Sequence, residues 1–375
     1  MQYTEYELGE LLPFEQPTAY IVKSTDYSDA YATPVLTAGK SFILGKTNET
    51  DGIFDQLPVI IFDDFTTATQ FVNFRFKVKS SAMKILHINT DLVIPKYIFY
   101  RLQIIQFDHS THKRYWIQSY SKIKVLIPSL DEQSRIVAYI EELFSELDKA
   151  VDTLKTTKEQ LEVYRQAVLK DAFSDFEKKD SIRNLTMVVT SGSRGWAKYY
   201  SNSGALFVRI GNLTHSGIDI DFRDIQHITP PDNAEGVRTR LQPNDVLVSI
   251  TADLGSIGFV SEKVEEAYIN QHIALVRFQN PVQGRFMAWY LRSEYGQKDL
   301  LKNKRGGGKL GLGLDDIRDT PVPIVDDVTA KETVDKIEEQ LSVCNSIEKT
   351  VDTALVQTDA MRQSILKQAF KEGSI

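Results

Sequence analysis

The stretch YRQAVLKDAF at residues 164–173 returns as MRQSILKQAF at residues 361–370, with six of ten positions identical. Upstream, Ile140-Glu141-Glu142 matches Ile337-Glu338-Glu339 at the same offset of 197 residues. A third pair of similar strings precedes these two, at residues 123–128 and 317–323. Three matches in one order and at nearly one offset indicate that the chain contains a duplicated unit.

The repeated stretches have helical periodicity, with an apolar residue at every seventh position. In the first copy this seam consists of Ile140, Leu147, Leu154, Leu161 and Val168. The second copy shows it less strictly, at Ile337, Cys344, Val351, Thr358 and Ile365. We expect a second seam three residues further on, formed by Leu143, Ala150, Thr157, Tyr164, Ile347, Ala354 and Met361.

Two long helices follow from this pattern, because no Gly or Pro interrupts residues 131–173 or 324–372. The first would be about 65 Å long at 1.5 Å per residue. Each helix alone would leave an apolar stripe in water, so the two stripes are expected to bury each other as a coiled coil.

The remaining chain has the composition of folded β-rich domains, with most of the Gly, Pro, aromatic and β-branched residues. Strands are predicted at residues 59–62, 71–76, 205–210 and 245–250, and short helices near 96–103 and 285–292. The sequence therefore predicts an α+β protein with globular domains at 1–128 and 182–320 and long helical segments at 129–181 and 321–375.

Composition limits the class of protein. The 375 residues are 42% hydrophobic and 25% charged, as in a soluble protein of two or three domains. The lone Cys344 excludes an internal disulfide and a zinc site built on cysteines, and its seam position predicts a small core residue. With no signal-like segment and no apolar run of about 18 residues, we expect a cytoplasmic protein without a membrane span.

The net charge of −7 is unevenly distributed. Residues 1–128 carry a net charge of 0 and residues 182–320 carry +2, whereas residues 129–181 and 321–375 carry −5 and −4. Acidic helices are poor phosphate binders but suitable surfaces for protein docking. The low overall charge therefore does not exclude nucleic-acid binding by the globular domains.

Two basic loops lie at matching places in the repeat. HSTHKRYW at residues 109–116 combines cations with aromatic residues, and Lys298, Lys302, Lys304, Arg305 and Lys309 surround Gly306-Gly307-Gly308. Lys and Arg neutralise phosphates, and glycine lets the backbone approach a ligand closely. Two ordinary solvated loops are the alternative interpretation, and their matching placement favours a shared role in phosphate contact.

Catalytic motifs are incomplete throughout. PVLTAGKS at 34–41 lacks the first glycine of a phosphate-binding loop, and GLGLDD at 311–316 is a truncated dinucleotide motif. Pro230-Pro231-Asp232 lacks the residue order of an amino-methyltransferase and has no downstream Asp/Glu-x-Lys for a nuclease. His109 and His112 have no evident carboxylate partner for a metal. We therefore predict no catalytic residue and no metal site.

The order of globular domain, long helix, globular domain and long helix resembles the specificity (S) subunit of type I restriction–modification enzymes. The most specific strings are IPSLDEQSRIV at 127–137, IEELFSELD at 140–148 and the two RQxxLKxAF boxes. Others lie in the globular domains: TPVLTAGK at 33–40, HKRYWIQ at 112–118, FVRIGN at 207–212 and NDVLVSI at 244–250. The entry to the second helix, VDDVTAKE at 325–332, departs from the family pattern.

This resemblance implies that each globular domain reads one half of a split site in double-stranded DNA. The helices would pair antiparallel in a pseudo-two-fold arrangement, act as a spacer and dock two modification subunits. Those subunits would hold S-adenosylmethionine and methylate adenine, and ATP-driven restriction subunits requiring Mg would join them. The chain itself would carry no cofactor and catalyse nothing, in a prokaryotic cytoplasm.

Candidate DNA contacts come from the basic loops and from the family-like strings. In the first domain they are Thr37, Lys40, Lys46, His112, Lys113, Arg114 and Tyr115. In the second they are Ser191, Arg194, Arg209, Asn212, Lys304, Arg305 and Lys309. Residues that follow predicted strands could also face DNA: Thr66, Thr67, Thr251 and Asp253. Arg209 could instead be a structural ion-pair partner, and Tyr115 a core residue.

Four residues of the helix boxes are candidates for partner contact: Arg165, Gln166, Arg362 and Gln363. They could instead bridge the helices within this chain. Two alternatives for the whole protein also stay open: a coiled-coil scaffold that binds only proteins, and the specificity subunit of a related system in which one partner both methylates and cleaves. The scaffold predicts no salt-dependent affinity for duplex DNA.

Overall fold

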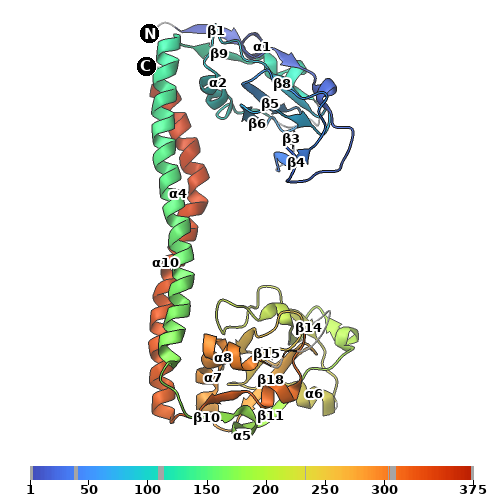
Figure 1. The fold of residues 1–375 in the computed structure, drawn as a ribbon, viewed down its shortest axis with the longest axis vertical. Helices are drawn as coiled ribbons and strands as arrows, with labels where there is room; N and C mark the ends of the chain where they lie inside the picture. The colour runs from blue at the N-terminus through green and yellow to red at the C-terminus, as the bar shows by residue number, and fades with distance from the viewer. Residues whose placement is uncertain are drawn as a thin grey trace. The chain divides into compact units, whose positions relative to one another are not determined.

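A computed structural model of the chain describes residues 3–37, 41–108, 114–232, 234–302, 304 and 310–372. It divides into two compact units: unit 1 comprises residues 1–154 and 353–375, and unit 2 comprises residues 155–352. Each unit contains one globular α+β domain and one segment of each long helix, α4 (Leu130–Phe173) and α10 (Asp327–Glu372) (Figure 1). The predicted long helices are thus confirmed.

The second long helix begins three residues later than its Gly- and Pro-free stretch, because Asp326 caps it. The Asp326 carboxylate accepts hydrogen bonds from the backbone N–H of Thr329 at 2.9 Å and from its hydroxyl at 3.0 Å. These bonds lower the pKa of Asp326. Side-chain acceptors of this kind satisfy the unpaired N–H groups of a first helical turn.

Unit 1 is built on two sheets and a strand pair. Antiparallel β1 (Thr4–Glu7) and β9 (Lys124–Ile127) form the pair. The four-stranded sheet has the order β2-β8-β5-β6, with β2 at Phe14–Glu15, β8 at Met83–Leu86, β5 at Val59–Asp63 and β6 at Thr69–Val72. The three-stranded sheet has the order β4-β3-β7, with β4 at Ile43–Thr47, β3 at Thr33–Leu36 and β7 at Lys77–Val78. Its short helices are α1 (Leu8–Leu11), α2 (Pro95–Leu102) and α3 (Tyr115–Gln118).

Unit 2 repeats this plan. Antiparallel β10 (Lys179–Ser181) and β19 (Pro321–Pro323) form its strand pair. One sheet has the order β11-β18-β15-β16, with β11 at Thr186–Ser191, β18 at Ile273–Phe278, β15 at Val246–Ser249 and β16 at Ile257–Phe259. The other has the order β12-β14-β13-β17, with β12 at Tyr200–Ser201, β14 at Gln226–Ile228, β13 at Ala205–Val208 and β17 at Ala267–Ile269. Its short helices are α5 (Ile182–Leu185), α6 (Ala234–Thr239), α7 (Gly284–Arg292), α8 (Glu294–Leu300) and α9 (Leu314–Arg318).

The duplication visible in the helices therefore extends to the globular domains. In both large sheets one inner strand, β5 or β15, pairs with two others. One is the next strand along the chain, β6 or β16, and the other is β8 or β18. In both smaller sheets one pair is parallel, β3 with β7 and β13 with β17. The predicted strands are present, but the one expected at 71–76 is shorter: β6 ends at Val72, and Phe76 bonds to Phe54 instead.

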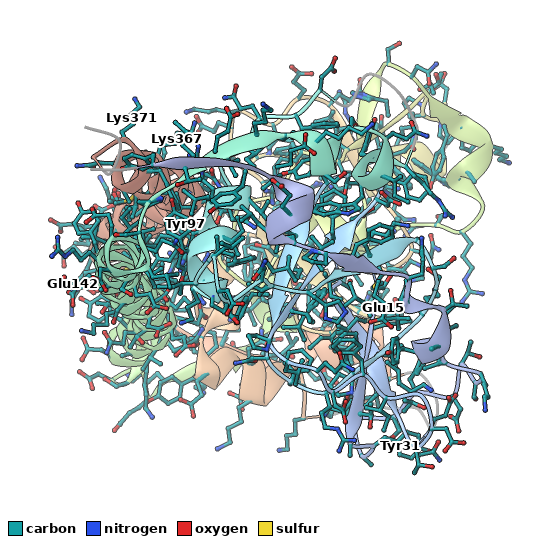
Figure 2. All side chains as sticks on the ribbon, turned by 90° about the horizontal axis from the view of Figure 1, so that it is seen from above. Glu15, Tyr31, Tyr97, Glu142, Lys367 and Lys371 are labelled. Carbon is teal, nitrogen blue, oxygen red and sulfur yellow. The ribbon has the colours of Figure 1, made fainter. Side chains whose placement is uncertain are left out.

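Each domain packs on its own helix segments through aromatic and aliphatic residues. In unit 1, α2 places Tyr97 against Phe370 of α10, with ring centroids 5.4 Å apart. Figure 2 shows Tyr97 on the side of unit 1 where Lys367 and Lys371 mark the end of α10, with Glu15 and Tyr31 on the other side. In unit 2, Phe286 of α7 packs against Phe173 of α4 at 5.4 Å. The predicted short helices, α2 and α7, thus pack each globular domain against a long helix of the same unit.

Ion pairs within each unit show that the helix segments run antiparallel. In unit 2, Lys158 pairs with Asp352 at 2.8 Å, Arg165 with Glu348 at 2.7 Å, and Asp171 with Lys336 at 3.1 Å. As the residue number rises along α4, it falls along α10. Arg362 pairs with Asp148 in unit 1. Further along α10, residues 366–370 share a core cluster with residues 136–140, nearer the start of α4, so the pairing is antiparallel within both units.

The first predicted seam is confirmed in part, and the second is wrong in register. Ile140, Ile337, Cys344 and Val351 are buried, whereas Ile347 and Met361 of the predicted second seam are 41% and 51% exposed. Burial instead includes Leu341 and Arg165, which lie four residues after a first-seam position. The 3.6-residue period of an α-helix permits either spacing, and packing selected the longer one. Among the described residues, no helix combines the length and apolar character that a membrane span requires.

Candidate nucleic-acid interface

The central strand of each large sheet ends in a tight turn held by its last side chain. In unit 1 the carboxylate of Asp63 accepts two backbone N–H groups of the turn, at 2.9 and 3.3 Å. In unit 2 the hydroxyl of Ser249 accepts a backbone N–H of the turn at 2.8 Å. Thr67 and Ala252 adopt positive φ angles of 58° and 59°, which non-glycine residues rarely do. We call these segments the strand-end turns: residues 64–68 in unit 1 and 250–256 in unit 2.

The segments that follow the two basic loops are bonded to these turns in the same way. In unit 1 the backbone N–H of Tyr115 donates to the carbonyl of Asp64 at 2.9 Å. In unit 2 the backbone N–H of Leu312 donates to the carbonyl of Ile250, also at 2.9 Å. The two basic loops, predicted to be equivalent from their charge and their matching places in the repeat, are thus each followed by a segment bonded to a strand-end turn.

A third segment completes each surface. The N–H of Asp64 donates to the carbonyl of Ala82 at 3.4 Å, and the N–H of Ile250 donates to that of His272 at 2.9 Å. The residues before β8 and before β18 thus lie against the strand-end turns. In unit 2, a bridge between Ser193 and Asn270 adds the segment that follows β11. We call the surface that these segments form the turn surface. It comprises residues 64–68, 80–82 and 114–115 in unit 1, and residues 191–194, 250–256, 270–272 and 311–312 in unit 2.

A histidine and a carboxylate stabilise the strand-end turn of unit 2. His215 Nε2 lies 2.8 Å from Asp253 Oδ1 and 3.1 Å from the hydroxyl of Ser256. The hydrogen bond from His215 is the main cause of a lowered pKa of Asp253. Asp253 therefore serves the turn itself, in addition to any contact with a ligand.

The predicted contacts of unit 1 separate into three groups. Arg114 is exposed on the turn surface, next to the strand-end turn that holds Thr66 and Thr67. Thr37 and Lys46 are half-buried on the β3–β4 hairpin of the smaller sheet, away from this bonding pattern. Three predicted contacts lie outside the described residues: Lys40, His112 and Lys113.

Tyr115, predicted as a DNA contact with a core role as the alternative, is buried, which supports the core role. Only 4% of its surface is exposed, and its ring packs on Phe107 with centroids 5.0 Å apart. The aromatic character that suggested base stacking is used for packing. Arg114 and Tyr115 are neighbours, but α3 begins at Tyr115 and turns it inward.

The predicted contacts of unit 2 also separate. Arg194 is exposed just after β11, Ser191 is half-buried at the end of that strand, and Lys304 is exposed in the basic loop. Arg305 and Lys309 lie outside the described residues. Arg209 donates to the carbonyl of Asp224 at 3.3 Å and lies 3.5 Å from its carboxylate. The structural interpretation of Arg209 is therefore the one that these bonds support.

Asn212, also predicted as a DNA contact, is buried and bonded within its own loop. It is 3% exposed, and its amide oxygen accepts the backbone N–H of Arg209 at 2.8 Å. Its amide nitrogen donates to the carbonyls of Asp221 at 2.8 Å and Asp224 at 3.1 Å. A buried amide with these partners fixes a loop and has little left to offer a ligand.

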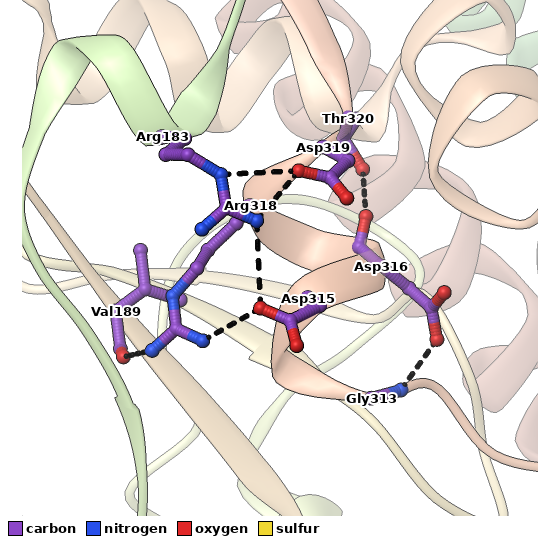
Figure 3. Close-up of polar contacts among 8 residues, drawn as sticks. All are labelled: Arg183, Val189, Gly313, Asp315, Asp316, Arg318, Asp319 and Thr320. Atoms are coloured by element: carbon purple, nitrogen blue, oxygen red, sulfur yellow. Dashed lines mark hydrogen bonds and ion pairs between the residues drawn. The ribbon is translucent and has the colours of Figure 1, made fainter.

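The helix after the basic loop of unit 2 is anchored by the network drawn in Figure 3. Arg318 donates to the carbonyl of Val189 at 2.8 Å and to Asp315 at 3.0 Å. Arg183 pairs with Asp319 at 2.7 Å. Hydrogen bonds from Arg318 and Arg183 also lower the pKa of Asp315. Because these carboxylates neutralise both arginines, the network serves to fix α9 rather than to attract an anion.

The predicted partner residues also contact their own chain. Arg165 is 8% exposed and paired with Glu348, and Arg362 pairs with Asp148 while its guanidinium lies 4.9 Å from the ring centre of Phe144. The alternative, that these arginines bridge the helices, is therefore confirmed for both. Gln166 and Gln363 are exposed on the helix surface.

Three side chains at the turn surface of unit 2 escaped the sequence analysis: Gln271, His272 and Arg238. Arg238 donates to the carbonyl of Ser191 at 2.7 Å and to the hydroxyl of Ser193 at 2.8 Å, which fixes the segment before Arg194. The run Asn270-Gln271-His272 directly after a strand was a usable signal. Within the described ranges, no cluster of three His, Cys, Asp or Glu side chains could hold a metal ion.

Similar proteins share sequence over part of the chain. No protein-family model matches it. A segment of 174 residues is 45% identical to the specificity subunit of the type I restriction enzyme EcoR124I/EcoR124II of Escherichia coli, covering 43% of each protein. Further type I specificity subunits from Escherichia coli and Salmonella potsdam are 24–27% identical over 274–278 residues. The chain spans about half the length of the curated relatives it matches.

Solved structures share the fold over nearly the whole chain. A chain from a study of complex assembly and conformational transition in the type I R-M system matches with a TM-score of 0.71, covering 98% of this chain and 97% of that one at 15% identity. The HsdS subunit of Thermoanaerobacter tengcongensis matches with a TM-score of 0.55, covering 98% and 96% at 16% identity. The resemblance carried by the helix boxes is confirmed: the chain has the fold of the type I specificity subunits and is a partial sequence relative of them.

Proposed function

We propose that this protein is the DNA sequence-specificity subunit of a type I restriction–modification complex. Each globular domain binds one half of a bipartite, asymmetric site in double-stranded DNA. The long helices set the distance between the half-sites and dock the partner subunits. The chain carries no catalytic residue for methylation or cleavage, and it works in the cytoplasm of a prokaryote.

The observation that carries this proposal is the repetition of one surface with different side chains. In both domains the chain that leaves the basic loop is bonded to the strand-end turn through the same backbone bond, at Tyr115 and at Leu312. The segment before β8 in unit 1, however, reads Ser80-Ser81-Ala82, and the matching segment before β18 in unit 2 reads Asn270-Gln271-His272. One frame with two sets of polar groups suits the reading of two unlike half-sites.

The helices offer the surface that partner subunits need. Val163 of α4 and Val356 of α10 are 70% and 80% exposed, on helices with acidic net charge. Val343 and Ile347 of α10, four residues apart, are 58% and 41% exposed, and exposed apolar side chains at helical spacing support docking of other helices. We propose two modification subunits there, with S-adenosylmethionine for adenine methylation, and restriction subunits that use ATP and Mg.

The decisive test compares the methylomes of a host strain with and without this gene. Loss of one split adenine motif on deletion is the expected result. An unchanged methylome, in a host where the neighbouring methyltransferase genes are expressed, would contradict the proposal. Binding of the purified chain to duplex DNA at several salt concentrations separates it from a protein-only scaffold, which would show no salt-dependent affinity.

A further inference from the structure

Three polar side chains at the turn surface of unit 2 are hydrogen-bonded to one another in a row. Thr251 lies in the strand-end turn, and Gln271 and His272 precede β18. The hydroxyl of Thr251 is 2.5 Å from His272 Nδ1, and His272 Nε2 is 2.8 Å from the amide nitrogen of Gln271. The backbone bond from Ile250 to His272 holds the turn and this segment together.

The direction of these bonds follows from the donors available. The amide nitrogen of Gln271 can only donate, so His272 Nε2 accepts and carries no proton. With Nε2 as the acceptor, Nδ1 carries the proton and donates to the Thr251 hydroxyl. Thr251 thus orients His272, and His272 orients the amide of Gln271.

An amide held in this way keeps one edge for a ligand. Gln271 uses one of its two N–H groups on His272 and retains the other together with its carbonyl oxygen. A donor and an acceptor side by side match the major-groove edge of adenine, which presents the N6 amino group and the N7 acceptor. Because the side chain is half-buried and already bonded, little rotamer freedom is lost when it contacts a base.

Arg194 is exposed next to Ser193, which forms a bridge with Asn270, so its guanidinium is available for a phosphate beside this side-chain row. In unit 1 the positions corresponding to Gln271 and His272, judged by the backbone bond from Asp64 to Ala82, hold Ser81 and Ala82. The Thr251–His272–Gln271 chain therefore belongs to unit 2 alone.

We propose that Gln271 reads an adenine base in the half-site bound by unit 2, with His272 and Thr251 as positioning residues. This inference rests on the proposed function and adds a specificity-determining residue to it. It assigns adenine recognition at one position to a side chain in the loop before β18.

The test measures base preference at every position of the recognition site. The full chain, purified together with the subunits that accompany it, binds the target duplex in competition with duplexes that each carry one substituted base pair. Gln271→Ala is expected to weaken discrimination for adenine roughly 5- to 150-fold at one position of one half-site. Gln271→Glu, of nearly the same shape, removes the donor and is expected to shift the preference at that position toward cytosine.

Matched variants separate reading from folding. Gln279→Ala removes an exposed glutamine of the same unit that bonds the carbonyl of Asn184, and it should leave all preferences unchanged. Thr251→Val should relax the same position as Gln271→Ala, and Thr251→Ser, which keeps the hydroxyl, should restore it. The half-site read by unit 1 reports whether the rest of the chain remains folded.

Each outcome decides one claim. If the wild-type protein selects no split site, the proposed function fails. If it selects a site and Gln271→Ala keeps every base preference, the assignment of Gln271 fails while the function stands. Loss of preference at all positions of the unit 2 half-site with Gln271→Glu also overturns it, because a single reading residue affects one position.

Discussion

The backbone N–H of Leu312 donates a 2.9 Å hydrogen bond to the carbonyl oxygen of Ile250. The same bond joins Tyr115 to Asp64 in the other unit, at the same length. These two bonds align the domains residue by residue across a stretch with little sequence identity. Side chains at matching positions can then be compared directly, and they account for several testable differences between the units.

Arg114 is an exposed cation of the unit 1 turn surface, and Arg114→Ala is expected to weaken binding of the complex to its target DNA. If Arg114 contacts a phosphate, the salt dependence of log affinity should fall by about one unit of slope. Fluorescence anisotropy at several salt concentrations measures both effects. Arg135→Ala, which removes an exposed arginine of α4, is the matched control. Unchanged affinity and slope would remove Arg114 from the contact surface.

The alignment places a buried ion pair in unit 1 where unit 2 has apolar residues. Lys84 Nζ lies 3.2 Å from the carboxylate of Asp64, and both side chains are 1% exposed. The corresponding residues, judged by the backbone pairing of each strand, are Ile250 and Ala274. Asp64→Asn leaves the buried Lys84 charge without a partner and is expected to lower the free energy of unfolding by about 3–5 kcal/mol.

A double variant tests that explanation. Asp64→Leu with Lys84→Met removes both charges and keeps the volume, so it should recover most of the loss. The recovery is incomplete because Asp64 Oδ1 also accepts the backbone N–H of Trp116 at 2.8 Å, and an unpaired buried donor costs about 1–3 kcal/mol. Urea unfolding measures both proteins. A double variant as unstable as Asp64→Asn would contradict the role of the buried charge.

The pair Arg165–Glu348 is expected to couple the two helices of unit 2. It lies at 2.7 Å with the arginine largely buried, so a double-mutant cycle with alanine should give a coupling energy of about 1–2 kcal/mol. The exposed pair Lys149–Glu146, at 2.9 Å within α4, should give less than about 0.5 kcal/mol. Equal coupling energies from the two cycles would show that burial of Arg165 adds nothing.

The strand-end turn of unit 2 should respond to acid through Asp253. The hydrogen bond from His215 lowers the pKa of Asp253 below its ordinary value of 3.8. A carboxyl group with a lowered folded-state pKa contributes stability above its unfolded pKa, and this is lost as the pH falls through the folded value. His215→Ala should raise the pKa of Asp253 toward 3.8, as measured by carbon NMR of the carboxyl group. An unchanged Asp253 pKa would contradict the role of His215.

Local patterns predicted the elements well. The helix over 131–173 was predicted because heptad spacing and the absence of Gly and Pro act over many residues together, and α4 spans Leu130–Phe173. Strands such as Val59–Phe62 were predicted because β-branched and aromatic residues follow one another there. The second seam was placed wrongly, because spacings of three and four residues are both compatible with one helical face and only the partner's shape selects between them.

Side-chain roles were predicted less well. Arg209, Asn212 and Tyr115 stand in loops or at element ends where sequence suggests exposure, yet each is held by partners distant in the chain, such as Asp224 for Arg209. Gln271 and His272 were missed although their place directly after a strand was a usable signal, because the sequence does not show which turn that loop faces.

The sequence by itself determined the duplication, the two long helices, the strand-rich domains and the matching basic loops, since each depends on composition or periodicity along the chain. Only the tertiary structure decided which loops lie against which turns, which arginines are neutralised by carboxylates, and where the helix seam is buried. Those features depend on contacts between residues far apart in the chain, such as Ile250 with Leu312. The strength of such a contact depends on the distance and orientation of its two groups, which no local sequence pattern specifies.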